Sequence, residues 1–299
     1  MDATISINNI SKTYPGKKPV TALKNINLQV TKGELFGLIG PDGAGKTSLF
    51  RILTTLLLAD DGSASVEQID VIDGFRQIRN RIGYMPGRFS LYQDLTIEEN
   101  LNFFADVFGT SVKANYDIIR DIYIQIEPFK NRKAGKLSGG MKQKLALCCA
   151  LIHKPDVLFL DEPTTGVDPV SRKEFWQILK QLKAQGITIM VSTPYMDEAS
   201  LCDRIALIQQ GQILSVDTPA KIVAAYPYPL FRIKAGNNYH LLKKLKSQPN
   251  VKLCYISGEY LHVVFKDADH SIDFPDAEIK ESLPTIEDCF IQLMSDERN

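Results

Sequence analysis

Apolar residues are distributed along this chain in short blocks of two kinds. In residues 4–10 and 22–30 they alternate with polar residues, which predicts half-buried strands in an antiparallel edge sheet. In residues 35–39, 157–160 and 187–191 they follow one another without interruption, which predicts strands buried on both faces. Strands of the second kind are typical of an α/β protein.

Between these strands the spacing of apolar residues changes to that of amphipathic helices. It predicts helices over residues 96–108, 115–129, 139–153 and 171–185. Thr96, with Glu99 three residues later, forms the capping box that starts the first of them. We also expect a turn at Gly62-Ser63 and a short strand over residues 64–66. The first two helices predict a helical subdomain within the α/β core.

The last quarter of the chain predicts a second, smaller folding unit. The segment Tyr226-Pro227-Tyr228-Pro229 is typical of a stiff linker. The pattern after it predicts a strand at 230–235, a helix at 239–247, strands at 251–257 and 260–265, and a helix at 285–294. We therefore expect two domains, residues 1–222 and a small α+β domain over residues 223–299. The second domain holds no catalytic pattern and suits docking or regulation.

The strand at 35–39 leads into the pattern G-x-x-x-x-G-K-T, and helix formers follow. Strand, glycine loop and helix is the context in which this pattern binds phosphate through backbone N–H groups at a helix start. Lys46 can reach the outer phosphates of a nucleotide, and Thr47 can hold Mg²⁺. The predicted nucleotide-binding residues are Gly40, Pro41, Asp42, Gly43, Ala44, Gly45, Lys46, Thr47 and Ser48.

Two acids end the buried strand at 157–160. The carboxyl ends of such strands form the edge at which open α/β sheets bind ligands. Asp161 is placed to hold Mg²⁺ directly or through water. Glu162 is placed to orient and deprotonate an attacking water. The alternative is a pair of solvated loop acids, which the phosphate loop in the same chain disfavours.

Two further features allow two interpretations each. Gly139 and Gly140 open a helix, where each glycine costs about 1 kcal/mol. They indicate either a close backbone approach to an anion or a helix capped by Ser138 with a loose entry. Tyr14 precedes a turn and can either stack on a base or pack as an ordinary turn residue.

Composition narrows the class of protein. The chain has 299 residues, with 35 Lys+Arg against 35 Asp+Glu, so no basic field suggests nucleic acid. The five cysteines are scattered without a C-x-x-C pair, which is typical of reduced thiols in a cytosolic protein. We find no signal peptide, and the apolar runs are too short to cross a bilayer. A role at a membrane would therefore require another chain to span it.

Taken together, these motifs resemble the ATP-binding cassette of ABC transporters over residues 4–220. They follow that family's order: the phosphate loop, Leu-Ser-Gly-Gly at 137–140, the strand and acids at 157–162, and a turn ending in Asp168. The resemblance implies a P-loop NTPase core with an antiparallel β subdomain and a helical subdomain. It also implies ATP and Mg²⁺ as cofactors and an ATPase activity.

The resemblance assigns roles and partners as well. Tyr14 becomes the adenine-stacking aromatic residue, Glu162 the catalytic base and Asp168 the acid of the D-loop. Domains of this family pair head to tail, so Ser138, Gly139 and Gly140 would contact the γ-phosphate of a partner domain's ATP. The segment from Leu283 to Phe290 resembles the C-terminal extension of drug- and antibiotic-exporter ATPases. The implied partners are a second ATP-binding domain and a separate membrane permease, with the chain at the cytoplasmic face of the membrane.

Two positions depart from the family's pattern. Gly87 stands where the family usually has a glutamine that touches Mg²⁺ and the water. Pro194 stands where it usually has a histidine that contacts the γ-phosphate, and proline offers neither a side-chain donor nor an N–H. Losing one such donor typically costs about 2.7–4 kcal/mol of barrier, or roughly 10² to 10³ in rate. We therefore expect slow turnover of the ATP on this chain's own loop.

Two other functions fit parts of the pattern. One is a regulatory subunit that binds nucleotide between two domains and hydrolyses little of it. The other is a soluble family member acting on DNA or ribosomes, which the balanced charge and the single cassette disfavour.

Overall fold

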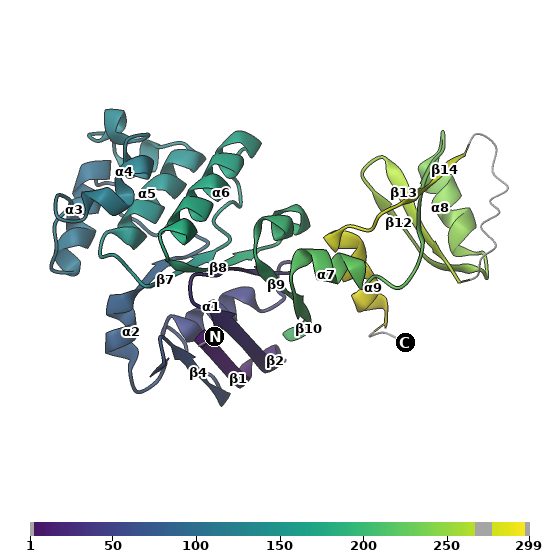
Figure 1. Cartoon of the computed structure of the whole chain (residues 1–299), viewed down its shortest axis with the longest axis horizontal. Coiled ribbons are helices and arrows are strands. Elements are labelled where there is room, and N and C mark those ends of the chain that lie inside the picture. The colour runs from purple at the N-terminus through teal and green to yellow at the C-terminus, as the bar shows by residue number, and fades with distance from the viewer. Residues whose placement is uncertain (1–2, 267–276, 297–299) are drawn as a thin grey trace. The chain divides into compact units, whose positions relative to one another are not determined.

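The computed structural model describes residues 3–266 and 277–296. They divide into two compact units, one running to Pro219 and the other beginning at Ala220. Each unit has a buried apolar cluster of its own. Figure 1 shows the elements of both.

The first unit is organised around a mixed sheet of the order β10-β9-β3-β8-β7-β6. All neighbours in it are parallel except β9 and β10. Its strands are β3 (Leu35–Ile39), β6 (Ile82–Met85), β7 (Val157–Asp161), β8 (Thr188–Thr193), β9 (Arg204–Gln209) and β10 (Gln212–Asp217). Every residue of β3, β7 and β8 is buried, as their uninterrupted apolar runs predicted.

A second, antiparallel sheet has the order β2-β1-β4-β5. Its strands are β1 (Ala3–Tyr14), β2 (Val20–Thr31), β4 (Asp61–Val66) and β5 (Ile69–Asp70). The predicted turn at Gly62-Ser63 is wrong, because both residues lie in β4 and Ser63 pairs with Asn8 of β1. Gly62 adopts a left-handed φ of 87° there, which bends the strand without ending it.

Helix α1 (Lys46–Leu53) lies between the two sheets, while α3 to α6 gather on the other side of β7 and β8 (Figure 1). These helices are α3 (Ile97–Val107), α4 (Tyr116–Tyr123), α5 (Gly139–Leu151) and α6 (Pro169–Ala184). A further helix, α2 (Phe75–Arg81), precedes β6. Short 3₁₀ helices are η1 (Glu127–Phe129), η2 (Ala134–Lys136) and η3 (Met196–Leu201). The capping box of Thr96 and Glu99 is confirmed. The helix predicted over 115–129 is too long, because α4 ends at Tyr123 and the hydrogen bonds after it are of the 3₁₀ type. Pro128 contributes to this early end, since a proline disfavours the α-helical conformation of the residue before it.

The second unit is an antiparallel sheet of the order β12-β13-β11-β14 with α8 packed on it. Its strands are β11 (Leu230–Lys234), β12 (Val251–Ser257), β13 (Tyr260–Phe265) and β14 (Glu278–Ser282), and its helices are α8 (Asn238–Lys246) and α9 (Ile286–Asp296), with α7 (Pro219–Ala224) at its start. The sequence did not predict β14, because this edge strand is mostly charged and largely exposed.

Among the helices of the described ranges, none is both long and apolar enough to cross a membrane.

Candidate nucleotide site

The phosphate loop joins the end of β3 to the start of α1, as predicted. Gly45 is the N-cap of α1 with a φ of 108°. A Cβ at this position would lie 2.4 Å from the carbonyl oxygen of Ala22, so both the backbone conformation and the space require glycine. The loop therefore leads straight into the helix start whose free N–H groups suit an anion.

Lys46, the first residue of α1, is buried, with 3% of its surface exposed. Its ammonium donates to the carbonyl oxygens of Gly40 at 2.7 Å and Pro41 at 3.0 Å. It also lies 3.0 Å from Oε1 of Glu162 in an ion pair. The structure thus brings together the lysine and the acid that the sequence had assigned to the outer phosphates and the attacking water.

The acids at the end of β7 are held by β8. Asp161 is 2% exposed, and its Oδ1 accepts a hydrogen bond of 2.6 Å from the Ser192 hydroxyl. The backbone N–H of Glu162 donates to the Ser192 hydroxyl and carbonyl oxygens at 3.0 and 3.1 Å. These bonds hold Glu162 at a φ of 51°, which is unusual for a residue with a side chain.

The donor set fits Mg²⁺ only together with phosphate oxygens. Thr47 and Asp161 would hold the ion, and hydroxyl and carboxylate oxygens suit it. Within the described part of the chain, no group of three or more His, Cys, Asp or Glu side chains is placed to hold a metal. Most of the remaining ligands would therefore come from the nucleotide and water.

Tyr14 lies beside the start of α1. Its hydroxyl is 3.1 Å from that of Ser48, and its ring is partly exposed. A ring at this place is available for stacking, and the adenine contact stays a prediction.

The signature segment opens α5 and packs against α6. Ser138 caps the helix by accepting from the Met141 N–H at 3.4 Å. A Cβ on Gly140 would lie 2.6 Å from the Ser171 hydroxyl, so packing inside this chain already explains that glycine. Ser138 and Gly139 are exposed, and their contact with a partner's ATP stays a prediction.

Asp168 is the N-cap of α6. Its carboxylate accepts from the N–H groups of Ser171 at 3.0 Å and Val170 at 3.1 Å. Hydrogen bonds from Ser171, and then from Val170, hold the pKa of this exposed acid below its usual range. The signature segment and the Asp168 turn therefore meet at the α5–α6 contact.

Both departures from the family pattern lie at the edge of the site. A Cβ on Gly87 would lie 3.0 Å from the carbonyl oxygen of Asp161. Pro194 directly follows β8, whose last residues are Ser192 and Thr193. Sequence reasoning missed the hydrogen-bonding role of these two hydroxyls and of Glu198, which is buried in η3. The available signal was an acid five residues beyond the end of a buried strand.

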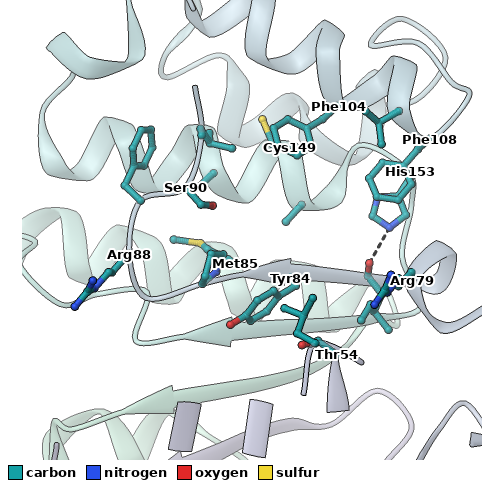
Figure 2. A pocket seen from close by; sticks show the side chains of 18 of the residues that line it. Thr54, Arg79, Tyr84, Met85, Arg88, Ser90, Phe104, Phe108, Cys149 and His153 are labelled. Carbon is teal, nitrogen blue, oxygen red and sulfur yellow. Dashed lines mark hydrogen bonds between the residues drawn. The ribbon is translucent and has the colours of Figure 1, made fainter. Parts of the chain in front are cut away.

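A groove of about 460 Å³ adjoins the site between β6 and the helices α3 and α5 (Figure 2). We call it the β6–α5 groove; its lining includes Tyr84, Met85, Arg88, Phe104, Phe108 and His153. Burial, and then the charge of Asp161, raise the pKa of Tyr84 to about 12. The lining includes residues on both sides of Gly87, so the groove lies next to Asp161.

This combination of a phosphate loop, paired acids at the end of β7 and a helical subdomain defines an ATP-binding cassette. The family described as "ABC transporter" matches residues 23–165, and the chain belongs to the ATP-binding proteins of this family. The nucleotide it binds through this fold is therefore ATP.

Three similar proteins illustrate the relationship. The probable multidrug ABC transporter ATP-binding protein YbhF of Escherichia coli (strain K12) is 39% identical over 304 residues, which cover 98% of this chain and 52% of YbhF. The chain thus spans about half of that relative. The Nod factor export ATP-binding protein I of Rhizobium sp. (strain N33) is 33% identical over 97% of this chain and 96% of its own. The dimeric cassette MJ0796, bound to ADP and Pi, superposes with a TM-score of 0.65 at 28% identity, covering 72% of this chain and 98% of MJ0796.

Proposed function

We propose that this chain hydrolyses ATP and thereby drives an ABC exporter whose membrane permease is a separate chain or domain. The observation that carries the proposal is the 3.0 Å ion pair between Lys46 and Glu162 at the phosphate loop. It places the Glu162 carboxylate, which can accept a proton, within reach of Lys46, the residue that we expect to bind the outer phosphates. A purely nucleotide-binding loop has no need of that carboxylate.

When bound, ATP would supply the phosphoanhydride bond that is broken, and Mg²⁺ held by Thr47 and Asp161 would neutralise part of the charge on the phosphate oxygens. Lys46 would exchange its bond to Glu162 for a phosphate oxygen and so release the carboxylate. Glu162 then orients a water and takes its proton. Ser192 holds the backbone of Glu162 and the side chain of Asp161 during this step.

Glu162→Gln tests hydrolysis against binding alone. Glutamine keeps the shape of the side chain but accepts no proton, so the ATPase rate should fall by roughly 10² to 10⁴. Binding of ADP should persist, because the phosphate loop is unchanged. Equal rates in the wild type and the variant would favour the second candidate, a regulatory subunit with little hydrolysis.

The exposed signature segment supports a second ATP-binding domain as a partner. Ser138 and Gly139 are available to a second ATP-binding domain, as the head-to-tail pairing of the family requires. MJ0796 is dimeric in the solved structure. We propose the same arrangement here, with a homologous or a different domain as the partner and with no nucleic acid.

We further propose that a permease segment occupies the β6–α5 groove. Phe104 and Phe108 offer it apolar contacts, and Arg88 offers a cation, so an apolar segment with an acidic side chain fits best. Export as the direction of transport is supported by the similarity to a multidrug transporter protein and a Nod factor export protein. Cross-linking of a Ser90→Cys variant to the co-purified permease tests the contact. A thiol that forms no cross-link and is labelled equally well with and without the permease would contradict it.

The location and the second domain belong to the same proposal. We place the chain at the cytoplasmic face of the membrane, held there by its permease. We also propose that residues 223–299 form an accessory or regulatory domain, which follows the ATP-binding domain of residues 1–222 in the sequence.

The departures at Gly87 and Pro194 support slow turnover at this chain's own loop. Pro194→His restores a donor and should raise the ATPase rate of the assembled complex, by up to roughly 10². Gly87→Gln is then added to Pro194→His. It comes second because a Cβ at position 87 would lie 3.0 Å from the Asp161 carbonyl oxygen, so the backbone there has to shift slightly. An unchanged rate in Pro194→His and in the double variant would contradict the proposal.

A further inference from the structure

Glu198 is a buried carboxylate that the reaction as described does not use. It lies in η3, five residues after the end of β8, and 2% of its surface is exposed. Its Oε1 accepts a hydrogen bond of 2.8 Å from the hydroxyl of Thr164. Its Oε2 accepts one of 2.5 Å from the hydroxyl of Thr193. Both threonines are buried.

The two threonines belong to different parts of the nucleotide site. Thr164 follows the base Glu162 by two residues. Thr193 ends β8, and its carbonyl oxygen accepts from the N–H of Gly40, the first residue of the phosphate loop, at 3.2 Å. The carboxylate of Glu198 therefore joins the segment that carries the base to the strand that supports the loop.

A cation compensates the buried charge and adds a third connection. Nε of Arg172 lies 3.6 Å from Oε1 of Glu198, and its guanidinium is 4.0 Å from the centre of the Tyr195 ring. Arg172 stands in the first turn of α6, the helix that Asp168 caps. The same carboxylate thus links the base segment to the Asp168 turn.

We propose that Glu198 is a positioning residue for ATP hydrolysis, which fixes Glu162 and the Asp168 turn relative to the phosphate loop. Glu162 needs such support, because its left-handed φ of 51° is strained for a residue with a side chain and persists only where neighbouring groups hold it. Ser192 holds its N–H, and Glu198 holds the loop two residues further on. The inference rests on the proposed hydrolysis and adds Glu198, Thr164 and Thr193 to its machinery.

The test removes single hydroxyls without changing side-chain shape. Thr164→Val and Thr193→Val each delete one bond to Glu198, and Thr164→Ser retains the hydroxyl. Thr188→Val is the matched control, because Thr188 is a buried threonine at the opposite end of β8 whose hydroxyl accepts from the N–H of Gly33 at 3.0 Å. All variants are made in the chain of 299 residues and assayed in the assembled complex.

We expect both valine variants at 164 and 193 to lower kcat by roughly ten- to a hundred-fold, since small misplacements of a reacting group have such effects. The KM for ATP and the Kd for ADP should stay within about two-fold, because ground-state binding is unaffected. Thr164→Ser should recover most of the rate lost in Thr164→Val. Thr188→Val should lower the unfolding midpoint while its kcat stays near the wild-type value.

Hydrogen exchange provides a readout that does not depend on turnover. Backbone amides of residues 162–168 should exchange faster in Thr164→Val and Thr193→Val than in Thr188→Val. Unchanged exchange, or a loss of stability with unchanged kcat in all three, would overturn the positioning role. A wild type without ATPase activity would instead refute the proposed function, while the exchange result would still judge the role of Glu198.

Discussion

At position 140 a side chain is excluded by a neighbour within the same chain. A Cβ there would meet the hydroxyl of Ser171 at 2.6 Å and its Cβ at 2.9 Å, whereas one on Gly139 would meet only the Gly166 carbonyl at 3.4 Å. The two adjacent glycines of the signature therefore have different physical reasons. Gly140 allows α5 and α6 to approach, whereas packing inside the chain does not explain Gly139.

We predict that Gly140→Ala destabilises the fold and Gly139→Ala does not. Overpacking costs about 1–3 kcal/mol, against a helix-propensity gain of at most about 1 kcal/mol. Gly139→Ala should keep that gain. Urea unfolding midpoints measure both, and Ser171→Gly in the Gly140→Ala background should restore stability. Equal midpoints for the two alanine variants would contradict this account of the packing.

At the scale of the elements, His153 lies where the end of α5 meets the start of β6, and its surroundings favour the neutral imidazole. Nε2 of His153 donates to the carbonyl oxygen of Ile82 at 2.9 Å, and the ring stacks on Phe108 with centroids 3.8 Å apart (Figure 2). Its Nδ1 is buried without a hydrogen-bond partner. Protonation would place an unpaired N–H there, and burial lowers the pKa of His153 below its usual value.

We predict a loss of stability in acid that depends on this residue. The unfolded chain binds a proton near the ordinary histidine pKa of about 6.5, whereas the folded chain binds it only at lower pH. The free energy of unfolding therefore falls as the pH drops below that value. In His153→Phe the decrease between pH 7.5 and 5.5 should be smaller, as measured by urea unfolding at each pH. Parallel curves for the two proteins would contradict the prediction.

The elements also show what could be predicted from the sequence. The strands β3, β7 and β8 and the phosphate loop were predictable, because local runs and spacings determine them. The strand β14 was not, because its pairing with β11 rather than its own charged residues makes it a strand. The role of Glu198 was not predictable either, since its bond to Thr164 joins residues 34 positions apart.

At the scale of the whole molecule, two apolar clusters suggest two cooperative transitions. In the second unit, Asp288 is fully buried at the start of α9. It accepts bonds from His262 Nδ1 at 2.5 Å, from the Tyr255 hydroxyl, and from the Thr285 hydroxyl and N–H, both at 2.6 Å. Burial alone would raise the pKa of Asp288, but the bonds from His262, Thr285 and Tyr255 together lower it.

We predict that the two transitions respond to different perturbations in calorimetry of the full chain. ADP with Mg²⁺ at a hundred times its Kd should stabilise the first unit by about 2.7 kcal/mol and raise only its transition. Asp288→Ala should lower only the other transition, because each buried donor left unpaired costs about 1–3 kcal/mol. Its effect should shrink in strong acid, since a carboxylate with a lowered pKa stabilises the fold above its unfolded pKa and loses that contribution as the pH falls through the folded value. If Asp288→Ala shifted the ADP-sensitive transition as much as the other, the two units would unfold as one, and the second domain would be part of the ATPase core.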